Sequence, residues 1–409
     1  MRKKLLILVV PAIFYAQSLT TLIDDAMKNN NIIKSKLMIE NSKVEDIEST
    51  KSGYFPTVDI GGFYQSVDER TPMQAGDTYS GYAKVGIDLY DGDNRSSQIK
   101  QNEALLSSSK YDTKAYKKSL TMMIVQDFYT IKSLEAHLVA LKEKDIQLKA
   151  ELQRTNKFYE AGIVTQDDVD NLQAAYSNNT YQIDSATFQI LSLKKLFTLK
   201  TGVQITILDN SSIKEPMGLK KELNDSIELL KQNAKSLDYA SNSLNSAYLP
   251  KVRLEDTYSM YGYNRDDASH PKGLDNQNVL MLSVSMRIFD NSSISKQKTS
   301  LRLKKQAIQE QIKQEELAQD INIELAISKI YTVKAQINSA KSSLKSASNA
   351  FKTIAKKYEV GNVDHVTYLD ALSVKTNAKA QYESALNNLQ IAYASYYYHT
   401  NKNIKDFIK

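Results

Sequence analysis

The chain has 409 residues with only 13 Gly and 6 Pro, a composition that favours long, uninterrupted helices. It contains no Cys, which excludes disulfides, thiolate metal sites, thiol nucleophiles and a lipid attached to an N-terminal Cys. Its net charge of +6 is mild and belongs partly to basic residues at the N-terminus, so it does not suggest nucleic-acid binding.

The N-terminus predicts a secretory signal peptide over residues 1–16. Three basic residues at positions 2–4 precede an apolar run from Leu5 to Phe14, and Ala16 offers a small residue for cleavage. An uncleaved anchor is the alternative, but the run is short for a bilayer and contains Pro11. No later stretch approaches the roughly 18 apolar residues of a transmembrane helix. We therefore expect an exported protein without a transmembrane helix.

The first repeat, residues 17–199, begins with a polar helix and a pair of strands. Spaced apolar residues predict one helix from Leu19 to about Ser52. The period of the apolar residues then changes to two, which predicts a strand pair over about 57–90. A polar loop at Asp68–Asp77 joins the two strands.

A long helix follows the strands and ends in a hairpin turn near Gly162. Its residues at alternating spacings of three and four predict a coiled-coil seam through Leu134, Leu138, Leu141, Asp145, Leu148 and Leu152. Gly162 is a natural helix stop, and a return helix is predicted from about Gln166 to Lys200. An irregular linker over residues 200–220 follows.

The second repeat, residues 221–397, has the same elements in the same order. Leu89-Tyr90-Asp91-Gly92 recurs as Ile288-Phe289-Asp290-Asn291, and Tyr159-Glu160-Ala161-Gly162 recurs as Tyr358-Glu359-Val360-Gly361. Both motifs recur at one offset, so the two spacers between them are equally long. A rigid helix of about 65 residues, or roughly 100 Å, explains this better than a loop. An amphipathic helix on a globular core is the alternative, and it would be shorter.

The elements of the second repeat can be placed in the same way. We expect a helix over about Lys221–Ser246, a strand pair over about 251–289, a hairpin tip near Gly361, a return helix over about His365–Tyr398 and a tail over 398–409. Heptad spacing from Ile330 to Tyr358 predicts a second coiled-coil seam. Asp256 is the exception, because alternation puts this carboxylate on the apolar face of its strand.

Each predicted strand has an apolar face and a polar face, the pattern of a membrane β-barrel wall with lipid outside and water inside. The polar, lumen-facing set would be Asp59, Gln65, Lys84, Asp88, Arg253, Ser283, Ser285 and Arg287. A soluble antiparallel sheet with one buried face is the alternative. The smallest barrels have about eight strands, and an open edge cannot lie in lipid. A membrane sheet would therefore be shared between chains, and symmetric closure would make a ring.

Taken together, these features resemble the TolC-type outer membrane efflux proteins. The resemblance covers nearly all of the chain after residue 16. It rests on the step Phe55-Pro56 (Leu249-Pro250 in the second copy), the aromatic-Asp turn after each strand pair and the repeated Tyr-x-x-Gly. It implies a mixed α/β membrane protein that forms a homotrimer. The three copies would share a twelve-stranded outer-membrane β-barrel and a long periplasmic α-helical coiled-coil barrel.

The resemblance also implies a function without chemistry. Such proteins are exit ducts in the outer membrane of Gram-negative bacteria and extend into the periplasm. They receive substrate from an inner-membrane pump of the RND or ABC type through a periplasmic adaptor protein, for efflux or type I secretion. They use no cofactor. The loops Asp68–Asp77 and Asn264–Gln277 would face outside the cell, and the transported substrate stays open.

In this family the hairpin tips form the periplasmic entrance, with its gate and its adaptor contacts. The turn residues that match the adaptor-contact region are Gly162, Ile163, Val164, Gly361 and Asn362. Asp168 and Tyr358 match a hydrogen-bonded pair that closes the gate. Asp370 matches one of two acidic rings, where three converging carboxylates would repel anions and attract cations.

Other tip residues depart from the family pattern. Thr367 occupies the other acidic position, so one ring is missing. Val363 stands where the best-known member has an Arg that locks the gate, and Asp364 is the candidate substitute. Ordinary capping and solvation of helix starts is the alternative role for Asp168, Asp364 and Asp370.

The remaining sequence offers little other chemistry. None of the four His lies at metal-ligand spacing with another His, and no phosphate loop or nucleophile elbow occurs, so no enzyme is expected. A periplasmic adaptor and a secreted coiled-coil rod remain as alternatives. An adaptor carries a single hairpin, whereas this chain has two. A rod would leave the alternating strands unexplained.

Overall fold

The computed structural model describes residues 17–409 except 69–75, 206, 219 and 265–272, so the predicted signal peptide and most of both polar loops lie outside the described residues. The chain divides into two compact units. The helical unit comprises the segments up to Ser35, Thr113–Asp225 and Glu316–Lys409. The sheet unit comprises Lys36–Asp112 and Ser226–Glu315. No helix in the described part of the chain is long and apolar enough to span a membrane.

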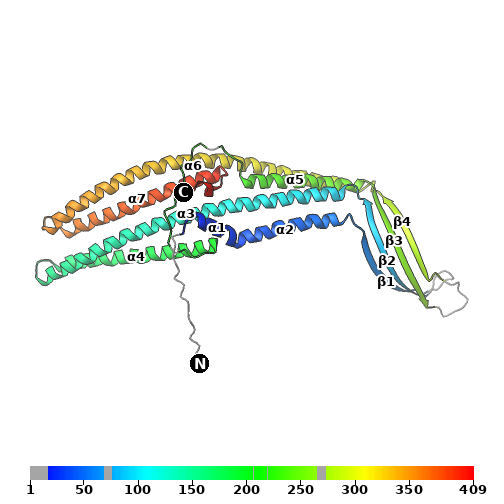
Figure 1. The fold of residues 1–409 in the computed structure, drawn as a ribbon, viewed down its shortest axis with the longest axis horizontal. Helices are drawn as coiled ribbons and strands as arrows, with labels where there is room; N and C mark the ends of the chain where they lie inside the picture. The colour runs from blue at the N-terminus through cyan, green and yellow to red at the C-terminus, as the bar shows by residue number, and fades with distance from the viewer. Residues whose placement is uncertain (1–16, 69–75, 206, 219, 265–272) are drawn as a thin grey trace, which may run out of the picture. The chain divides into compact units, whose positions relative to one another are not determined.

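The sheet unit contains one antiparallel sheet of four strands in the order β1-β2-β3-β4 (Figure 1). The strands are β1 (Thr57–Ser66), β2 (Asp77–Tyr90), β3 (Lys251–Asn264) and β4 (Asn276–Ser285). All four were predicted, but the last ends at Ser285 rather than near Ile288. Ser285 pairs with Lys251, the first residue of β3, so β4 has no pairing partner beyond it. Arg287 therefore lies outside the strand and is not part of its polar face.

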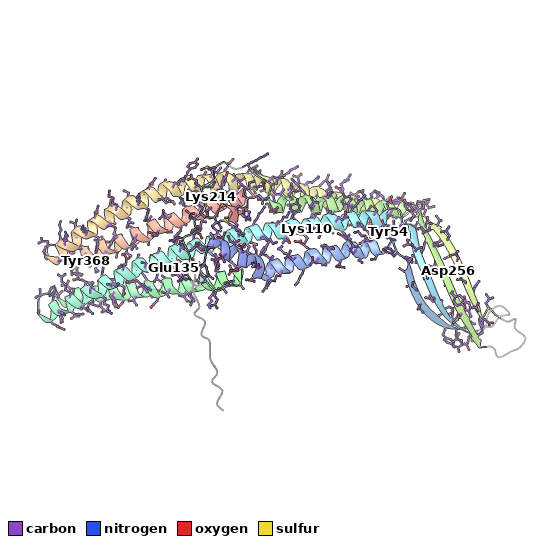
Figure 2. All side chains as sticks on the ribbon, viewed as in Figure 1. Tyr54, Lys110, Glu135, Lys214, Asp256 and Tyr368 are labelled. Atoms are coloured by element: carbon purple, nitrogen blue, oxygen red, sulfur yellow. The ribbon has the colours of Figure 1, made fainter. Side chains whose placement is uncertain are left out.

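The register of the sheet confirms the two predicted faces. Val58, Val85, Asp256 and Leu280 lie in one row across the four strands, and Asp88, Arg253 and Ser283 lie in another row on the opposite face. Asp256 is thus on the apolar face, as expected (labelled in Figure 2). The register shifts between Asp88 and Tyr90, so Leu89 sits in a β-bulge and does not continue the apolar row.

One predicted helix is split in two, and another begins later than predicted. The helix predicted over Leu19–Ser52 is two helices, α1 (Leu19–Asn29) and α2 (Asn31–Ser52). The Asn30 side chain accepts the N–H groups of Ile32 and Ile33 and so caps α2. The next helix, α5 (Asp225–Asn245), begins four residues later than expected. The preceding Glu222 lies outside the helix, and its backbone N–H donates to the carbonyl of Thr400.

Two helices of equal length confirm the predicted rigid spacers. Both α3 (Asn94–Glu160) and α6 (Ser293–Glu359) have 67 residues, which corresponds to about 100 Å of helix. The return helices are α4 (Gln166–Thr201) and α7 (His365–His399). Every predicted seam residue from Ile330 to Tyr358 is buried or half-buried. The alternative of shorter helices on a globular core is wrong.

The core of the helical unit gathers segments from both repeats. Phe128 and Tyr129 of α3, Phe197 of α4 and Tyr397 of α7 are all at most 1% exposed. The predicted C-terminal tail belongs to this core, because its short helix η2 (Ile404–Phe407) places Phe407 against the Tyr397 ring at 3.9 Å between centroids. Backbone hydrogen bonds join Ser212 of the linker to Lys409 in both directions. Linker and tail therefore pair with each other and pack against this core.

Replacing Phe128 with Ala tests this core. The side chain is fully buried, so we expect the Phe128→Ala variant to lose about 3–5 kcal/mol of unfolding free energy. Lys313→Ala, on an exposed stretch of α6, should change it by at most about 0.5 kcal/mol. Denaturant unfolding followed by helical circular dichroism measures both, and equal shifts would contradict the assignment of the core.

Candidate functional site at the hairpin tips

Each long helix ends in the same hydrogen-bonded turn. The N–H of Gly162 donates to the carbonyl of Tyr159, and the N–H of Ile163 donates to that of Phe158. Gly361 and Asn362 donate in the same way to the carbonyls of Tyr358 and Lys357. This is the Schellman arrangement, which needs a left-handed residue after the helix. Gly162 and Gly361 supply it with φ angles of +71° and +75°.

The return helices begin with acidic caps. Asp364 is the N-cap of α7, and its carboxylate accepts the N–H of Thr367 at 2.8 Å. Hydrogen bonds from the side chain and the backbone N–H of Thr367 lower the pKa of Asp364. Asp168 lies at the third position of α4 and accepts from the N–H and the hydroxyl of Thr165, both at 3.1 Å. The capping alternative is therefore correct for Asp168 and Asp364 within one chain.

Asp168 also reaches the other hairpin. Its second carboxylate oxygen, Oδ1, lies 3.1 Å from Nδ1 of His365, the first residue of α7. The starts of α4 and α7 are thus joined directly. This contact was not predicted, because Asp168 was expected to pair with Tyr358 and no partner was expected for His365. The signal was present in the sequence, since His365 follows the capping Asp364 of the second tip.

Tyr358 does not meet Asp168 within the chain, contrary to the predicted pair. Its hydroxyl hydrogen-bonds Glu151 and Thr155 of α3. Its ring stacks on Tyr368 of α7, labelled in Figure 2, with 4.8 Å between centroids. Burial, followed by the charge of Glu151, raises the pKa of Tyr358 to about 12. The Tyr358 side chain faces the seam between the hairpins, whereas the Asp168 carboxylate accepts hydrogen bonds at the start of α4.

A small core surrounds this tyrosine and holds the two hairpins together. Leu148, Leu172 and Leu372 are each at most 1% exposed and pack with Tyr368. Arg154 lies 5.4 Å from the Tyr358 ring centre and 3.7 Å from the carboxylate of Glu151. Glu151 follows Leu148 by three residues and Thr155 follows Glu151 by four, so their burial on a shared helix face could have been inferred from sequence.

The remaining predicted tip residues are mostly on the surface. Gly162, Ile163, Gly361, Asn362, Thr367 and Asp370 are exposed, and Val164 and Val363 are half-buried. Ile163, Val360 and Val366 are large apolar side chains with more than half of their surface accessible. A Cβ added at either tip glycine would meet no atom within 4 Å. The tips therefore present an open, partly apolar surface.

The polar face of the sheet is a second candidate surface. The predicted residues Asp59, Gln65, Lys84, Asp88, Arg253, Ser283 and Ser285 share this face by register. Arg253 bridges Asp88 at 2.8 Å and Glu255 at 3.4 Å, and Lys84 lies 3.7 Å from Glu255. The charges here largely neutralise one another. Among the described residues no group of His, Cys, Asp and Glu could hold a metal ion.

Comparisons with known proteins agree with this architecture. A family model described as outer membrane efflux protein matches residues 22–192 and 221–398. No curated protein matches the chain. Among solved structures, the Campylobacter jejuni CmeC outer membrane channel is 17% identical with a TM-score of 0.77, covering 95% of this chain and 88% of that one. The outer membrane protein VceC of Vibrio cholerae is 12% identical with a TM-score of 0.78, covering 94% and 96%.

Asp364 provides a test of the capping geometry. Because hydrogen bonding lowers its pKa, its stabilising effect should be complete above about pH 4, the ordinary carboxylate range, and be lost as pH falls through the lowered value. After correction for intrinsic exchange rates, the protection of the amides in the first turn of α7 should therefore fall in acid. Asp364→Ala should exchange fast at all pH values, whereas Asp364→Asn, which caps without a charge, should show no acid dependence. Acid-dependent exchange in Asp364→Asn would contradict the assignment.

Proposed function

Since the chain belongs to the outer membrane efflux protein family and lies in the outer membrane, we propose that three copies assemble into one exit duct. The duct takes substrate from an inner-membrane pump of the RND or ABC type, through a periplasmic adaptor protein, and releases it outside the cell. The periplasmic adaptor and rod alternatives are set aside with the family assignment. The observation that carries the assembly is the open four-stranded sheet.

The sheet cannot be complete in a membrane. Its edge strands β1 and β4 have 10 residues each, and nothing in the described chain pairs with their outer sides. Unpaired backbone N–H and C=O groups each cost several kcal/mol in lipid. Strand directions alternate across the sheet, so β4 of one copy can pair antiparallel with β1 of the next. Three copies then close a twelve-stranded barrel with the apolar face outward.

The apolar face supports the same orientation. Val58, Ile60, Leu280 and Val284 are between 66% and 86% exposed in the single chain. Such a contiguous apolar surface needs a cover, and acyl chains provide one. The opposite face, with its internally paired charges, would line a water-filled lumen. Asp256 is a charged residue in the row of Val58, Val85 and Leu280 on this apolar face, which a lipid-facing β-barrel tolerates at moderate cost.

The helices also carry apolar side chains without a cover in the single chain. Exposed residues follow α4 at Tyr181, Phe188, Leu191 and Leu199, and follow α6 at Leu317, Ile321, Leu325 and Tyr331. Two different stripes can pair head to tail, the heterologous contact that closes a ring of identical copies. This supports a helical barrel continuing from the shared strands.

The hairpin tips are the proposed entrance. Three copies of exposed Asp370 would form an acidic constriction that attracts cations and repels anions. Thr367 leaves the second acidic ring absent, and Val363 provides no locking cation. The exposed turn residues Gly162, Ile163, Gly361 and Asn362, with half-buried Val164, are the proposed adaptor contact. Closure of the gate would depend on the inter-hairpin contacts of Tyr358 and Asp168.

Cross-linking between the edge strands tests the shared barrel, and the absence of native Cys makes it clean. Thr57→Cys and Ser285→Cys lie at the ends of β1 and β4 on the same face. Within one chain the edge strands are about 14 Å apart, three strand spacings. A shorter bifunctional thiol reagent should therefore join neighbouring copies and give dimer and trimer bands on a denaturing gel.

Each single Cys variant is the control and should give no trimer band. The shared barrel would be contradicted if the double variant gave only monomer, both in detergent and in membranes, and if a second double variant with Ser283→Cys in place of Ser285→Cys gave the same result. Bands from more than three joined copies would be consistent with the duct but would contradict a trimer.

Tyr358→Phe tests the proposed gate. The change removes a hydroxyl that bonds the buried Glu151, a loss of about 1.5–3 kcal/mol between the hairpins, while the stacking on Tyr368 stays. In planar bilayers we expect longer or more frequent openings than in the unmodified protein. Tyr159→Phe is the matched control, because Tyr159 holds the same place in the first motif but is exposed. Indistinguishable conductance traces for Tyr358→Phe and the unmodified protein would contradict the role of Tyr358.

A further inference from the structure

The helices next to the sheet follow the order of the strands. In the chain α2 precedes β1, α3 follows β2, α5 precedes β3 and α6 follows β4 (Figure 1). Hydrogen bonds between side chains join neighbouring helices in the same order, from Asn102 to Thr50, from Ser243 to Asn94 and from Lys305 to Asp238. In the sheet unit α2 and α6 are therefore the first and last helices of a row, as β1 and β4 are the first and last strands.

The first helix of the row carries a stripe of exposed side chains, which we call the α2 stripe. Leu37, Asn41, Val44 and Glu48 follow one another at spacings of four, three and four, so they share one face of the helix. All four are exposed, Leu37 to 41% and Val44 to 40%. Thr50, which contacts α3, comes two residues after Glu48 and so points about 200° away around the helix. The α2 stripe therefore faces away from α3.

The last helix of the row carries a matching stripe, the α6 stripe. Lys296, Ser300, Leu303 and Ala307 are again spaced by four, three and four. All four are exposed, Leu303 to 58%. Lys305, which contacts α5, comes two residues after Leu303 and points about 200° away from it. The α6 stripe therefore faces away from α5.

The two stripes match in height along their helices. At 1.5 Å per residue, Lys296 lies about 4.5 Å from the start of α6, and Glu48 lies about 6 Å from the end of α2. These are the helix ends next to the strands. Val44, at about 12 Å, falls between Ser300 and Leu303, at about 10.5 Å and 15 Å. If the stripes meet, a cation faces a carboxylate near the sheet and the apolar side chains interdigitate farther away.

The charges on the two helices are complementary. Ser293–Gln309 at the start of α6 contains five Lys and Arg and no Asp or Glu, whereas the corresponding Asn94–Lys110 of α3 contains three and one Glu. The positive end of the helix dipole opposes cations at a helix start, so α6 by itself gains nothing from them. On α2, Glu45 is exposed beside Glu48, which has Lys51 of its own helix at 2.9 Å. An acidic helix surface would offset the charge of α6.

We propose that the α6 stripe of one copy packs against the α2 stripe of the next, with Lys296 paired to Glu48. The inference rests on the proposed function, in which β4 of one copy pairs with β1 of its neighbour and so brings α6 beside the neighbour's α2. Because the two stripes differ, the contact is head to tail and repeats around a ring. An ionic seam thus joins the copies next to the shared strands.

Charge reversal in the full protein tests the seam. Lys296→Glu sets two carboxylates against each other in every seam. We expect the trimer to dissociate faster on heating in detergent, about two- to threefold for each seam and roughly ten- to thirtyfold for a ring of three. A glutamate suits the start of α6 better than a lysine, so this loss would not come from a weaker helix. Glu48→Lys should act alike, and the double variant Lys296→Glu/Glu48→Lys should restore the original rate.

Lys313→Glu is the matched control. Lys313 is an exposed lysine of the same helix, its ion-pair partner at 2.8 Å is Glu310 of α6 itself, and it lies about 25 Å beyond Lys296. Its reversal should leave the dissociation rate unchanged. Equal rates for Lys296→Glu and the unmodified protein would overturn the seam. A faster rate that Glu48→Lys does not restore would assign Lys296 to another anion, such as a phospholipid headgroup, and would also overturn it.

Cross-linking separates failure of the seam from failure of the duct. A short bifunctional thiol reagent should join Lys296→Cys to Glu48→Cys of the next copy and give trimer bands. Within one chain α3 and α5 separate these positions by three interhelical distances, roughly 25 Å, which is beyond its reach. Bands from the edge-strand pair Thr57→Cys and Ser285→Cys alone would overturn the seam and keep the duct. Bands from the helix pair alone would keep the seam and contradict the shared barrel, and bands from neither would contradict both.

Discussion

The backbone of the outer strands imposes the constraint on which the proposed assembly depends. A four-stranded sheet leaves the N–H and C=O groups on the outer sides of β1 and β4 without partners in the described chain. Water could satisfy these groups, but lipid cannot, so in the proposed duct the edges pair with those of other copies. A shared barrel in turn requires each copy to present the same strands at the same height. Two helices of identical length after the two strand pairs suit that requirement.

Inside one chain, different forces act at different places along the helices. Leucine, alanine and aromatic side chains are buried in the seams between helices. Their burial attracts the helices to one another strongly and without a preferred direction. At the tips this gives way to a few directional contacts, from Tyr358 to Glu151 and Thr155 and from His365 to Asp168. Contacts of this kind are worth only a few kcal/mol. A gate built from them could open without melting the core.

The elements that sequence predicted well are those whose signal is periodic or locally chemical. The long helices, both hairpin glycines and the two sheet faces follow from spacing and from the conformational freedom of Gly. The errors are local. Asn30 splits a helix because its side chain caps the next one, and β4 stops at Ser285 because β3 offers no partner beyond Lys251. Such endings depend on one side chain or on another strand, which periodicity does not record.

The sequence by itself determined the duplication, the secondary structure and the family, because equal spacing and alternating polarity are properties of the linear chain. Only the tertiary structure decided which tip residues meet. In the structure His365 contacts Asp168, and Tyr358 contacts Glu151. The resemblance to the family had instead paired Asp168 with Tyr358. The reason is geometric. Side-chain partners across two hairpins depend on the rotation and axial offset of four packed helices. Successive residues point about 100° apart around a helix, so a shift of one residue in the packing changes every contact.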